Sequence, residues 1–310
     1  MMNIATLTLN PTIDVAYSLD RFVHSDKLRT AEQKADPGGG GINVARVFVR
    51  LGGNARCVYM SGGSTGAALD ALLDLHQIVR EPVSIEGETR ISATMFEQSS
   101  GHEYRIVPAG PVISEAEWHT CLDRLSSVEC DYLVISGSLP RGIPADFYAQ
   151  VASDAKQRGV RTVLDSSGDA LKAAVAAGKL EMVKPNLKEF QQLIGEDISD
   201  PILIGKAAQD IARSGSARLI VVSLGERGGI LASAEHVIEC AAPKVASVSS
   251  VGAGDSCVAA MVHCLAAGKS NEEAFRYGMA AGGAALLTPG TDLARPADIR
   301  RLFEQYVSET

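Results

Sequence analysis

The sequence predicts an α/β fold in which a mostly parallel sheet is flanked by helices and carries a small β lid. Short runs rich in β-branched residues alternate with longer segments rich in Ala, Leu, Glu and Lys. Two stretches, 12–35 and 86–108, break this alternation and have the texture of half-buried β segments. No internal repeat, low-complexity tract or linker divides the chain, so residues 1–310 are expected to form one domain.

Several short apolar runs have the composition of strands buried on both faces of a sheet. They lie at 4–9, 57–60, 132–136, 160–165, 180–184 and 218–224. Longer segments with the composition of helices alternate with them. They lie at 42–51, 64–75, 144–158, 206–214, 253–267 and 271–287. A strand, a helix and a strand in succession require crossover connections, which make the strands parallel and cover both faces of the sheet.

The second irregular stretch has the alternation of a β-hairpin. Apolar residues occupy every second position, at Ile91, Ala93 and Met95 before a Ser-Ser-Gly turn and at Tyr104 and Ile106 after it. Two such segments on either side of one βα unit predict a small accessory sheet over the main domain. This sheet fits a lid, a dimerisation surface or both, and an edge extension of the main sheet is the alternative.

Composition and charge limit the expected partners. The formal net charge is −8, so nucleic acid, which needs a basic face, is not expected as a partner. No apolar stretch approaches the ~20 residues that cross a bilayer, and the amino-terminal residues lack a signal-peptide pattern, so no membrane contact is expected. No pair of the six cysteines forms a CxxC motif, which favours reduced thiols in a cytoplasmic protein.

A glycine-rich turn, which follows a strand-like segment at 245–248, has the features of an anion site. In Gly252-Ala253-Gly254-Asp255 the glycines let the backbone expose successive N–H groups, and the start of a helix adds unpaired donors. An aspartate would repel a bound phosphate there, but it is suited to take a proton from an attacking hydroxyl group. The alternative is an ordinary aspartate at a helix N-terminus.

A second glycine cluster, at 38–41, opens the predicted helix at 42–51. Four consecutive glycines are costly to order, which favours close approach of the backbone to a ligand over a merely flexible turn. The chain has no Walker A loop, because the segment that ends at 268–270 has His263 in place of the first glycine. It also has no GxGxxG motif after the first strand, which argues against an NAD-dependent dehydrogenase.

The two glycine motifs in this order resemble the signatures of the ribokinase, or phosphofructokinase B, family of carbohydrate kinases. The pattern Gly-Gly-x-Gly-x-Asn ends at Asn43, and the pattern Val-Gly-Ala-Gly-Asp ends at Asp255. The resemblance spans essentially the whole chain, and it implies a ribokinase-like fold.

Further segments resemble one branch of that family, which acts on phosphosugars. Residues 8–14 and 136–142 are similar to this branch in general. Gly40, where some members of the branch carry lysine, and the segments at 165–168 and 183–186 resemble its minor bacterial 6-phosphofructokinases of the isozyme 2 type.

The resemblance implies ATP-dependent phosphorylation of fructose 6-phosphate at the C1 hydroxyl, which yields fructose 1,6-bisphosphate. Tagatose 6-phosphate or fructose 1-phosphate is the alternative substrate, and a non-catalytic sugar-phosphate sensor is the alternative outside the enzymes. By the same resemblance Asp255 is the base that deprotonates the sugar hydroxyl, and Gly252, Ala253 and Gly254 form the anion hole. Phosphoryl transfer depends mainly on positioning and charge neutralisation, which agrees with these roles.

The resemblance also implies residues that bind the sugar. Asp14 and Asn43 would hydrogen-bond its hydroxyl groups, Gly38 and Gly39 would allow its close approach, and Ser138 would line the same site. Asp14 alone would indicate only a turn residue.

On the nucleotide side the implied contacts lie in three segments of the second half of the chain. They are Lys184, Asn186, Ser223, Gly225 and Gly228. Asn186 and Glu189 match a family element that orders Mg²⁺ and its waters around the phosphates, whereas alone they indicate a helix cap with a capping-box glutamate. The segment at 223–229 alone indicates a hairpin turn into 230–233, and both interpretations can hold together.

Three cations lie in the two irregular stretches: Lys27, Arg90 and Arg105. Isolated charges in hairpins are usually solvated, but if the stretches form one lid these cations can converge on the phosphate that the sugar already carries. The resemblance further implies activation by K⁺ near residues 249–250 and 285–292. It also implies a homodimer that forms through the lid.

Overall fold

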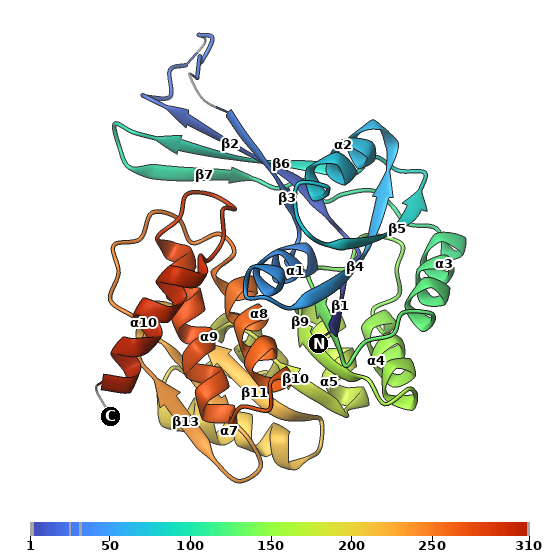
Figure 1. Cartoon of the computed structure of the whole chain (residues 1–310), viewed down its shortest axis with the longest axis vertical. Coiled ribbons are helices and arrows are strands. Elements are labelled where there is room, and N and C mark those ends of the chain that lie inside the picture. The colour runs from blue at the N-terminus through green and yellow to red at the C-terminus, as the bar shows by residue number, and fades with distance from the viewer. Residues whose placement is uncertain (1–2, 25, 31–32, 309–310) are drawn as a thin grey trace.

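The computed structural model describes residues 3–24, 26–30 and 33–308, and it consists of a large α/β unit with a small sheet projecting from one end (Figure 1). In this described part the large sheet has nine strands in the order β13-β12-β11-β10-β9-β8-β1-β4-β5. Seven neighbouring strands of this sheet, β11, β10, β9, β8, β1, β4 and β5, are parallel to one another. Strands β12 and β13 extend the sheet beyond β11 and pair antiparallel. The predicted α/β fold with a mostly parallel sheet is therefore confirmed.

The strands of the large sheet are short and mostly buried. Their bounds are β1 (Asn3–Thr8), β4 (Asn54–Gly62), β5 (Val79–Ile85), β8 (Tyr132–Ser136), β9 (Arg161–Asp165), β10 (Leu180–Val183), β11 (Ala217–Ser223), β12 (Gly229–Ala232) and β13 (Val237–Cys240). Successive side chains of a strand point to opposite faces, so β1 places Ile4 in one core and Ala5 and Leu7 in the other. Burial of apolar side chains on both faces stabilises the sheet.

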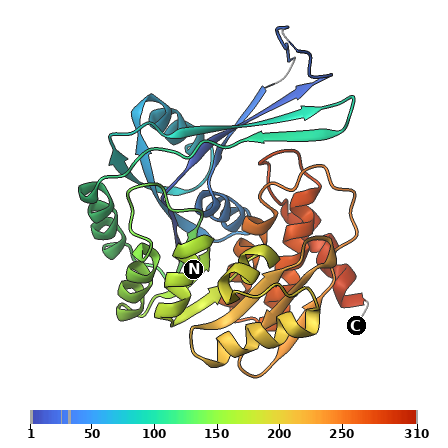
Figure 2. The same ribbon diagram turned by 180° about the vertical axis from the view of Figure 1, so that it is seen from behind.

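Helices cover both faces of this sheet, as the views from the front and from behind show (Figures 1 and 2). One face carries α3 (Glu115–Ser126), α4 (Phe147–Gln157), α5 (Gly168–Ala177), α6 (Leu187–Ile194) and α7 (Pro201–Arg213). The other face carries α1 (Gly40–Arg50), α8 (Ala253–Ala266), α9 (Asn271–Leu286) and α10 (Pro296–Ser308). Helix α2 (Gly63–Leu73) follows β4 and packs between the large sheet and the small one. None of the helices in the described part is long and apolar enough to span a membrane.

Alanine packing holds helix α8, which carries Asp255 in its first turn, against helix α9. Ala260 on α8 and Ala280, Ala281 and Ala284 on α9 are fully buried in one cluster. Small side chains let two helix backbones approach closely, and a Cβ added at Gly278 would lie only 2.4 Å from Cγ of Met261. The start of α8 is therefore held rigidly against the rest of the domain.

The two irregular stretches of the sequence meet in a separate four-stranded sheet, seen at the top of Figure 1. It is built from β3 (Gln33–Gly38), β2 (Thr12–Leu19), β6 (Arg90–Glu97) and β7 (His102–Ile106), in that order. An edge extension of the main sheet is therefore excluded. The predicted hairpin is present as β6 and β7, which pair antiparallel.

The more buried face of β6 is polar, and the alternating apolar residues of this strand lie on its opposite face. Ser92 is 8% exposed, whereas Ile91 is 45% exposed. The polar face lies over the main domain. On the opposite face Tyr104 and Ile106 are largely exposed, whereas Ile13 and Val15 of β2 are buried in the core that α1 and α2 share. The small sheet is therefore attached to the main domain through apolar contacts of β2 and β3, and its polar face remains free to line a cavity.

Several local predictions need correction. The segment 245–248, predicted as a strand, is irregular, because it runs along the wall of a cavity and its Val248 N–H donates to the Leu286 carbonyl at 2.7 Å. The composition did not indicate α3, α5, α10, β5 or β13, and it indicated α6 only through the helix cap at 186–189. The other predicted strands and helices are present, with shifts of a few residues at their ends.

Candidate active site

The carboxyl ends of the parallel strands meet below the small sheet, where an open α/β sheet usually binds its ligands. A cleft of about 360 Å³ lies there. Its walls include nine residues that the sequence indicated: Asp14, Gly39, Asn43, Arg90, Arg105, Ser138, Glu189, Gly252 and Asp255. The chain thus brings together segments that are more than 200 positions apart.

A larger and more apolar cavity of about 860 Å³ lies on the other side of the start of α8. All five residues indicated for a nucleotide line it: Lys184, Asn186, Ser223, Gly225 and Gly228. Its apolar wall comes from Pro243, Val245, Met279 and Leu286. A cavity of this size and polarity is suited to an adenosine group.

The first turn of α8 lies between the two cavities. Gly252 takes a left-handed conformation (φ 74°) as the residue before the helix, and a Cβ there would lie 2.2 Å from Leu293. Gly252 faces the cleft, whereas Ala253 and Gly254 face the larger cavity. The first amide groups of a helix lack partners within it and carry the positive end of its dipole, so this turn can bind an anion that reaches from one cavity to the other.

Asp255 lies in this first turn and reaches into the cleft. Its Oδ2 accepts a hydrogen bond from Nδ2 of Asn43 at 2.9 Å. Burial and the charge of Asp165 raise the pKa of Asp255, Asn43 and Lys184 lower it, and the resulting pKa is about 6. At neutral pH the carboxyl group is mostly ionised, yet its pKa is close enough to 7 for it to take up a proton.

A buried ion pair lies between the cleft and the larger cavity. Nζ of Lys184, which is 5% exposed, lies 3.2 Å from Oδ2 of Asp165. Burial opposes the charge of Lys184, but the carboxylate of Asp165 outweighs it and the pKa of Lys184 is raised. A Cβ added at Gly254 would lie 3.3 Å from this Nζ, so the ammonium group lies directly under the glycine turn.

The glycine cluster before α1 allows close packing around the cleft. A Cβ at Gly38 would lie 2.0 Å from Oδ2 of Asp14, and one at Gly40 would lie 2.1 Å from Oγ of Ser136. Gly39 has φ 111°, a conformation that favours glycine. The cluster is therefore required by the close approach of neighbouring groups and is not a merely flexible turn.

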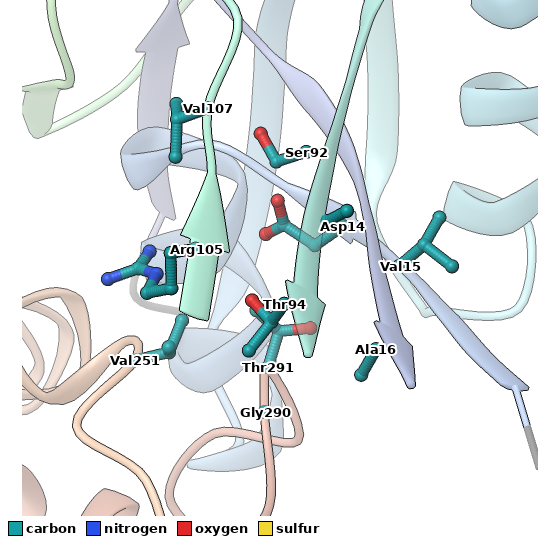
Figure 3. A pocket seen from close by; sticks show the side chains of 11 residues that line it. Asp14, Val15, Ala16, Ser92, Thr94, Arg105, Val107, Val251, Gly290 and Thr291 are labelled. Carbon is teal, nitrogen blue, oxygen red and sulfur yellow. The ribbon is translucent and has the colours of Figure 1, made fainter. Parts of the chain in front are cut away.

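The polar face of the small sheet forms the roof of the cleft. Asp14 and Arg105 lie on it, above Val251 and Thr291 of the main domain, around a hollow of about 10 Å³ (Figure 3). Burial raises the pKa of Asp14 more than Arg105, Arg90 and Arg46 lower it, and the resulting pKa is about 6. The roof therefore combines a carboxyl group that can accept hydrogen bonds with a positive potential.

The three predicted cations do not all meet within one chain. Arg90 and Arg105 both line the cleft. Two nitrogens of Arg90 donate to the carbonyls of Asn10 and Pro108 at 2.8 and 2.9 Å, so its guanidinium is held in place. Lys27 lies in another hollow, near the far end of β2, and does not join them.

Asn186 and Glu189 form the capping box that their spacing indicates. Oδ1 of Asn186 accepts from the N–H of Glu189 at 2.9 Å, and Oε2 of Glu189 accepts from the N–H of Asn186 at 2.8 Å. Glu189 also lines the cleft, and Asn186 lines the larger cavity. Among the described residues no three His, Cys, Asp or Glu side chains are grouped so that they could hold a metal ion.

Sequence reasoning missed two charged residues of the site. Asp165 was noted only as part of a similar segment, and its pairing with Lys184 depends on the alignment of β9 with β10. Arg46 lies three residues after the end of the Gly-Gly-x-Gly-x-Asn motif and was assigned no role, although it is buried beside Asn43. The only signal in the sequence was their charge: if such a side chain is buried, it is expected to have a partner of opposite charge.

The two cavities, the anion-binding turn between them and a carboxylate that can take a proton are the parts of an enzyme that transfers a phosphoryl group from a nucleotide. The chain belongs to the pfkB family of carbohydrate kinases, whose family model matches residues 7–298. It is an ATP-dependent sugar kinase of this family, as the sequence predicted.

Curated relatives match the chain along nearly its whole length. The ATP-dependent 6-phosphofructokinase isozyme 2 of Escherichia coli (strain K12) is 41% identical over 304 residues, which are 98% of each protein. A tagatose-6-phosphate kinase of Staphylococcus epidermidis is 32% identical over 282 residues, which are 90% of each protein.

Solved structures confirm the ribokinase-like fold. Phosphofructokinase-2 from Escherichia coli in complex with potassium superposes with a TM-score of 0.94 at 41% identity, over 99% of this chain and 100% of the other. The same enzyme in complex with fructose-6-phosphate gives a TM-score of 0.92 at 40% identity, and its tetrameric inhibited form gives 0.91 at 40% identity, both with the same coverage.

The ion pair below the glycine turn yields a stability prediction. Lys184→Met is expected to lower the free energy of unfolding by about 3–5 kcal/mol, because it leaves the carboxylate of Asp165 without its partner. Urea unfolding at neutral pH measures this loss. Lys269→Met is the matched control: its ion pair with Glu273 is exposed, so the same substitution is expected to change stability little. An equal effect of the two substitutions would contradict the structural role of Lys184.

Proposed function

We propose that this enzyme uses ATP to phosphorylate the C1 hydroxyl of fructose 6-phosphate, which yields fructose 1,6-bisphosphate and ADP. The observation that carries the proposal is the position of Asp255, which lies at the start of α8 where the cleft meets the larger cavity. The choice of sugar is supported by the identity of 41% to a 6-phosphofructokinase, against 32% to a tagatose-6-phosphate kinase.

In the proposed reaction the carboxylate of Asp255 removes the proton of the C1 hydroxyl. The oxygen then forms a bond to the γ-phosphorus of ATP, while the bond from that phosphorus to the bridging oxygen breaks and ADP leaves. The amide groups of Gly252, Ala253 and Gly254 stabilise the negative charge on the transferred group. The raised pKa of Asp255 suits it to hold the proton until products leave.

The cleft has groups for both ends of the sugar phosphate. Asp14 accepts hydrogen bonds from hydroxyl groups of the sugar, and Asn43 donates one to them. Gly38 and Gly39 have no side chain that would hinder the approach of the sugar, and Ser138 lines the cleft. Arg90 and Arg105 bind the phosphate at the other end, as charge-assisted pairs. A local pair of arginines explains how a protein with a net charge of −8 holds an anionic sugar.

ATP occupies the larger cavity in this proposal, with its phosphates directed toward the first turn of α8. Ser223, Gly225 and Gly228 form the turn beside the base and ribose, and Lys184 and Asn186 lie closer to the phosphates. The strand order supports this arrangement, because the 223–229 turn joins the antiparallel strands β11 and β12 at the rim of that cavity.

Mg²⁺ would be held through water by Asn186 and Glu189. The carboxylate of Glu189 lines the cleft and suits a cation that keeps several of its waters, and the lack of a protein metal cage among the described residues agrees with this. When bound, Mg²⁺ supplies positive charge to the nucleotide phosphates. The chain's own contribution is to orient those waters from a capping box that is already fixed by two hydrogen bonds.

We further propose that K⁺ activates the enzyme. The segments at 249–250 and 285–292 lie together, since the N–H of Val248 donates to the carbonyl of Leu286. A potassium complex of a relative at 41% identity supports this proposal.

The small sheet, from 12–35 and 86–108, acts in this proposal as a lid and as the surface of a homodimer within a single-domain subunit. Its apolar face leaves Ile91, Tyr104 and Ile106 more than 40% exposed, which is typical of a protein–protein contact. A related enzyme has been solved as a tetrameric inhibited form, so larger assemblies are compatible with this fold. All six cysteines are free, which supports a cytoplasmic location.

A coupled assay of ADP release with three sugars tests the proposed substrate. With equal ATP and Mg²⁺, kcat/KM for fructose 6-phosphate is expected to exceed that for tagatose 6-phosphate and fructose 1-phosphate at least about 10-fold, which corresponds to about 1.4 kcal/mol of transition-state binding. Omission of K⁺ is expected to lower the rate. No turnover with fructose 6-phosphate would exclude the proposal.

Replacement of the base separates a kinase from a sugar-phosphate sensor. Asp255→Asn keeps the size and hydrogen-bonding capacity of the side chain but cannot accept the proton, so kcat is expected to fall about 10²–10⁴-fold. The affinity for ATP, measured by titration calorimetry, is expected to stay within a few-fold. Retention of full activity would show that another group takes the proton.

Arg105→Ala tests the phosphate end of the cleft. The loss of one guanidinium that faces the sugar phosphate is expected to raise KM for fructose 6-phosphate at least about 10-fold and to leave KM for ATP nearly unchanged. Arg141→Ala is the control, because its guanidinium donates to the Gly110 carbonyl outside the cleft. Equal increases of the two KM values in Arg105→Ala would place the phosphate elsewhere.

A further inference from the structure

Arg46 is a buried charge whose role the site described above does not explain. It lies on α1, one turn after Asn43, and is only 2% exposed. Its Nη1 donates to the Pro37 carbonyl at 2.9 Å and to Oδ1 of Asn43 at 3.3 Å. Its Nη2 lies 3.4 Å from Oδ1 of Asp36 on β3.

These contacts allow only one orientation of the Asn43 amide. Arginine has donors and no acceptor, and an ionised aspartate has acceptors and no donor. The oxygen of Asn43 therefore faces Arg46, and its NH₂ group faces Asp255 at 2.9 Å. A flipped amide would bring two donors together on one side and two acceptors together on the other.

We propose that Arg46 is a positioning residue for the base: it holds the amide of Asn43 in the orientation that donates to the carboxylate of Asp255. The proposal rests on the proposed role of Asp255 as the base. The chain of contacts runs from Asp36 on the small sheet through Arg46 and Asn43 on α1 to Asp255 on α8. It thus joins the roof of the cleft to the residue that takes the proton.

A contribution to stability alone does not account for this buried charge, because a buried ion pair gains little over apolar residues of similar size. Burial lowers the pKa of Arg46 to about 10, against the effect of Asp36, so its guanidinium stays charged at neutral pH. Its other charged neighbours are Arg50 on the same helix, and Asp292, Asp14 and His76 on the elements packed against that helix. The charges that face Asp255 itself are Asp165, Lys184 and Asp14.

The test is the pH profile of kcat/KM in Arg46→Met. A loosened amide hydrogen-bonds the ionised carboxylate less well, and loss of such a bond raises the pKa of an acid. The acid limb of the profile is expected near pH 6 in the unchanged enzyme and about one unit higher in Arg46→Met, and kcat is expected to fall about 10-fold. KM for ATP is expected to change less than about two-fold, since Arg46 does not line the nucleotide cavity.

Two further variants separate this role from general damage to the helix. Val47→Ala removes a fully buried side chain from the same helix, so it is expected to lower the melting temperature and leave the pH profile unchanged. Arg46→Lys keeps the charge and some donors, so it is expected to restore part of the activity. If Arg46→Met does not fold, Arg46→Lys carries the test, with a smaller shift of the acid limb in the same direction.

A double-mutant cycle shows whether Arg46 acts through Asn43. In an Asn43→Ala background the addition of Arg46→Met is expected to cause no further loss of kcat and no further shift, because the amide is already absent. A direct effect of the charge on Asp14 or Asp255 would persist in that background and would overturn the proposal. An unchanged pH profile in the single Arg46 variants would overturn it as well.

The outcome for Asp255→Asn separates this proposal from the proposed function. If Asp255→Asn remains fully active, the assignment of the base fails. If Asp255→Asn is inactive while the Arg46 variants keep the normal profile, only the positioning role of Arg46 fails.

Discussion

The site depends on one electrostatic balance: a carboxylate lies in the first turn of a helix whose amide groups attract anions. Desolvation and Asp165 push the pKa of Asp255 up, and Asn43 and Lys184 hold it down. In the proposed reaction the resulting pKa, about 6, lets Asp255 be ionised when substrate arrives and protonated when product leaves. The packing of α8 against α9 and the buried ion pair below the turn both serve to keep these groups at fixed distances.

The parallel sheet provides the frame for this balance. β9 and β10 end at the same edge, which brings Asp165 beside Lys184, and β1 ends there too and leads into β2 of the small sheet, which carries Asp14. The small sheet adds a roof whose polar face points inward. In the proposed function this division leaves phosphoryl transfer to the large α/β unit and recognition of the sugar phosphate largely to the small sheet.

Much of this arrangement was predictable from the sequence, because strand and helix patterns and glycine motifs are local properties. The small sheet was predictable for the same reason. Which face of β6 is buried was not predictable, because the apolar face of a strand is usually the buried one, and here the polar face is buried over the cleft. The position of Lys27, the pairing of Asp165 with Lys184 and the contacts of Arg46 depend on how distant segments align. Spacing along the chain carries no information about such contacts.

The glycine at position 40 also constrains how this site can change over evolutionary time. Any side chain there would overlap Oγ of Ser136, which is itself buried at the end of β8. A family member that carries a long side chain at this position therefore needs a turned serine side chain and a shifted end of β8, because the added Cβ would also lie 3.0 Å from the carbonyl carbon of Ser136. A substitution at position 40 alone is therefore not expected to convert one type of sugar-phosphate site into another.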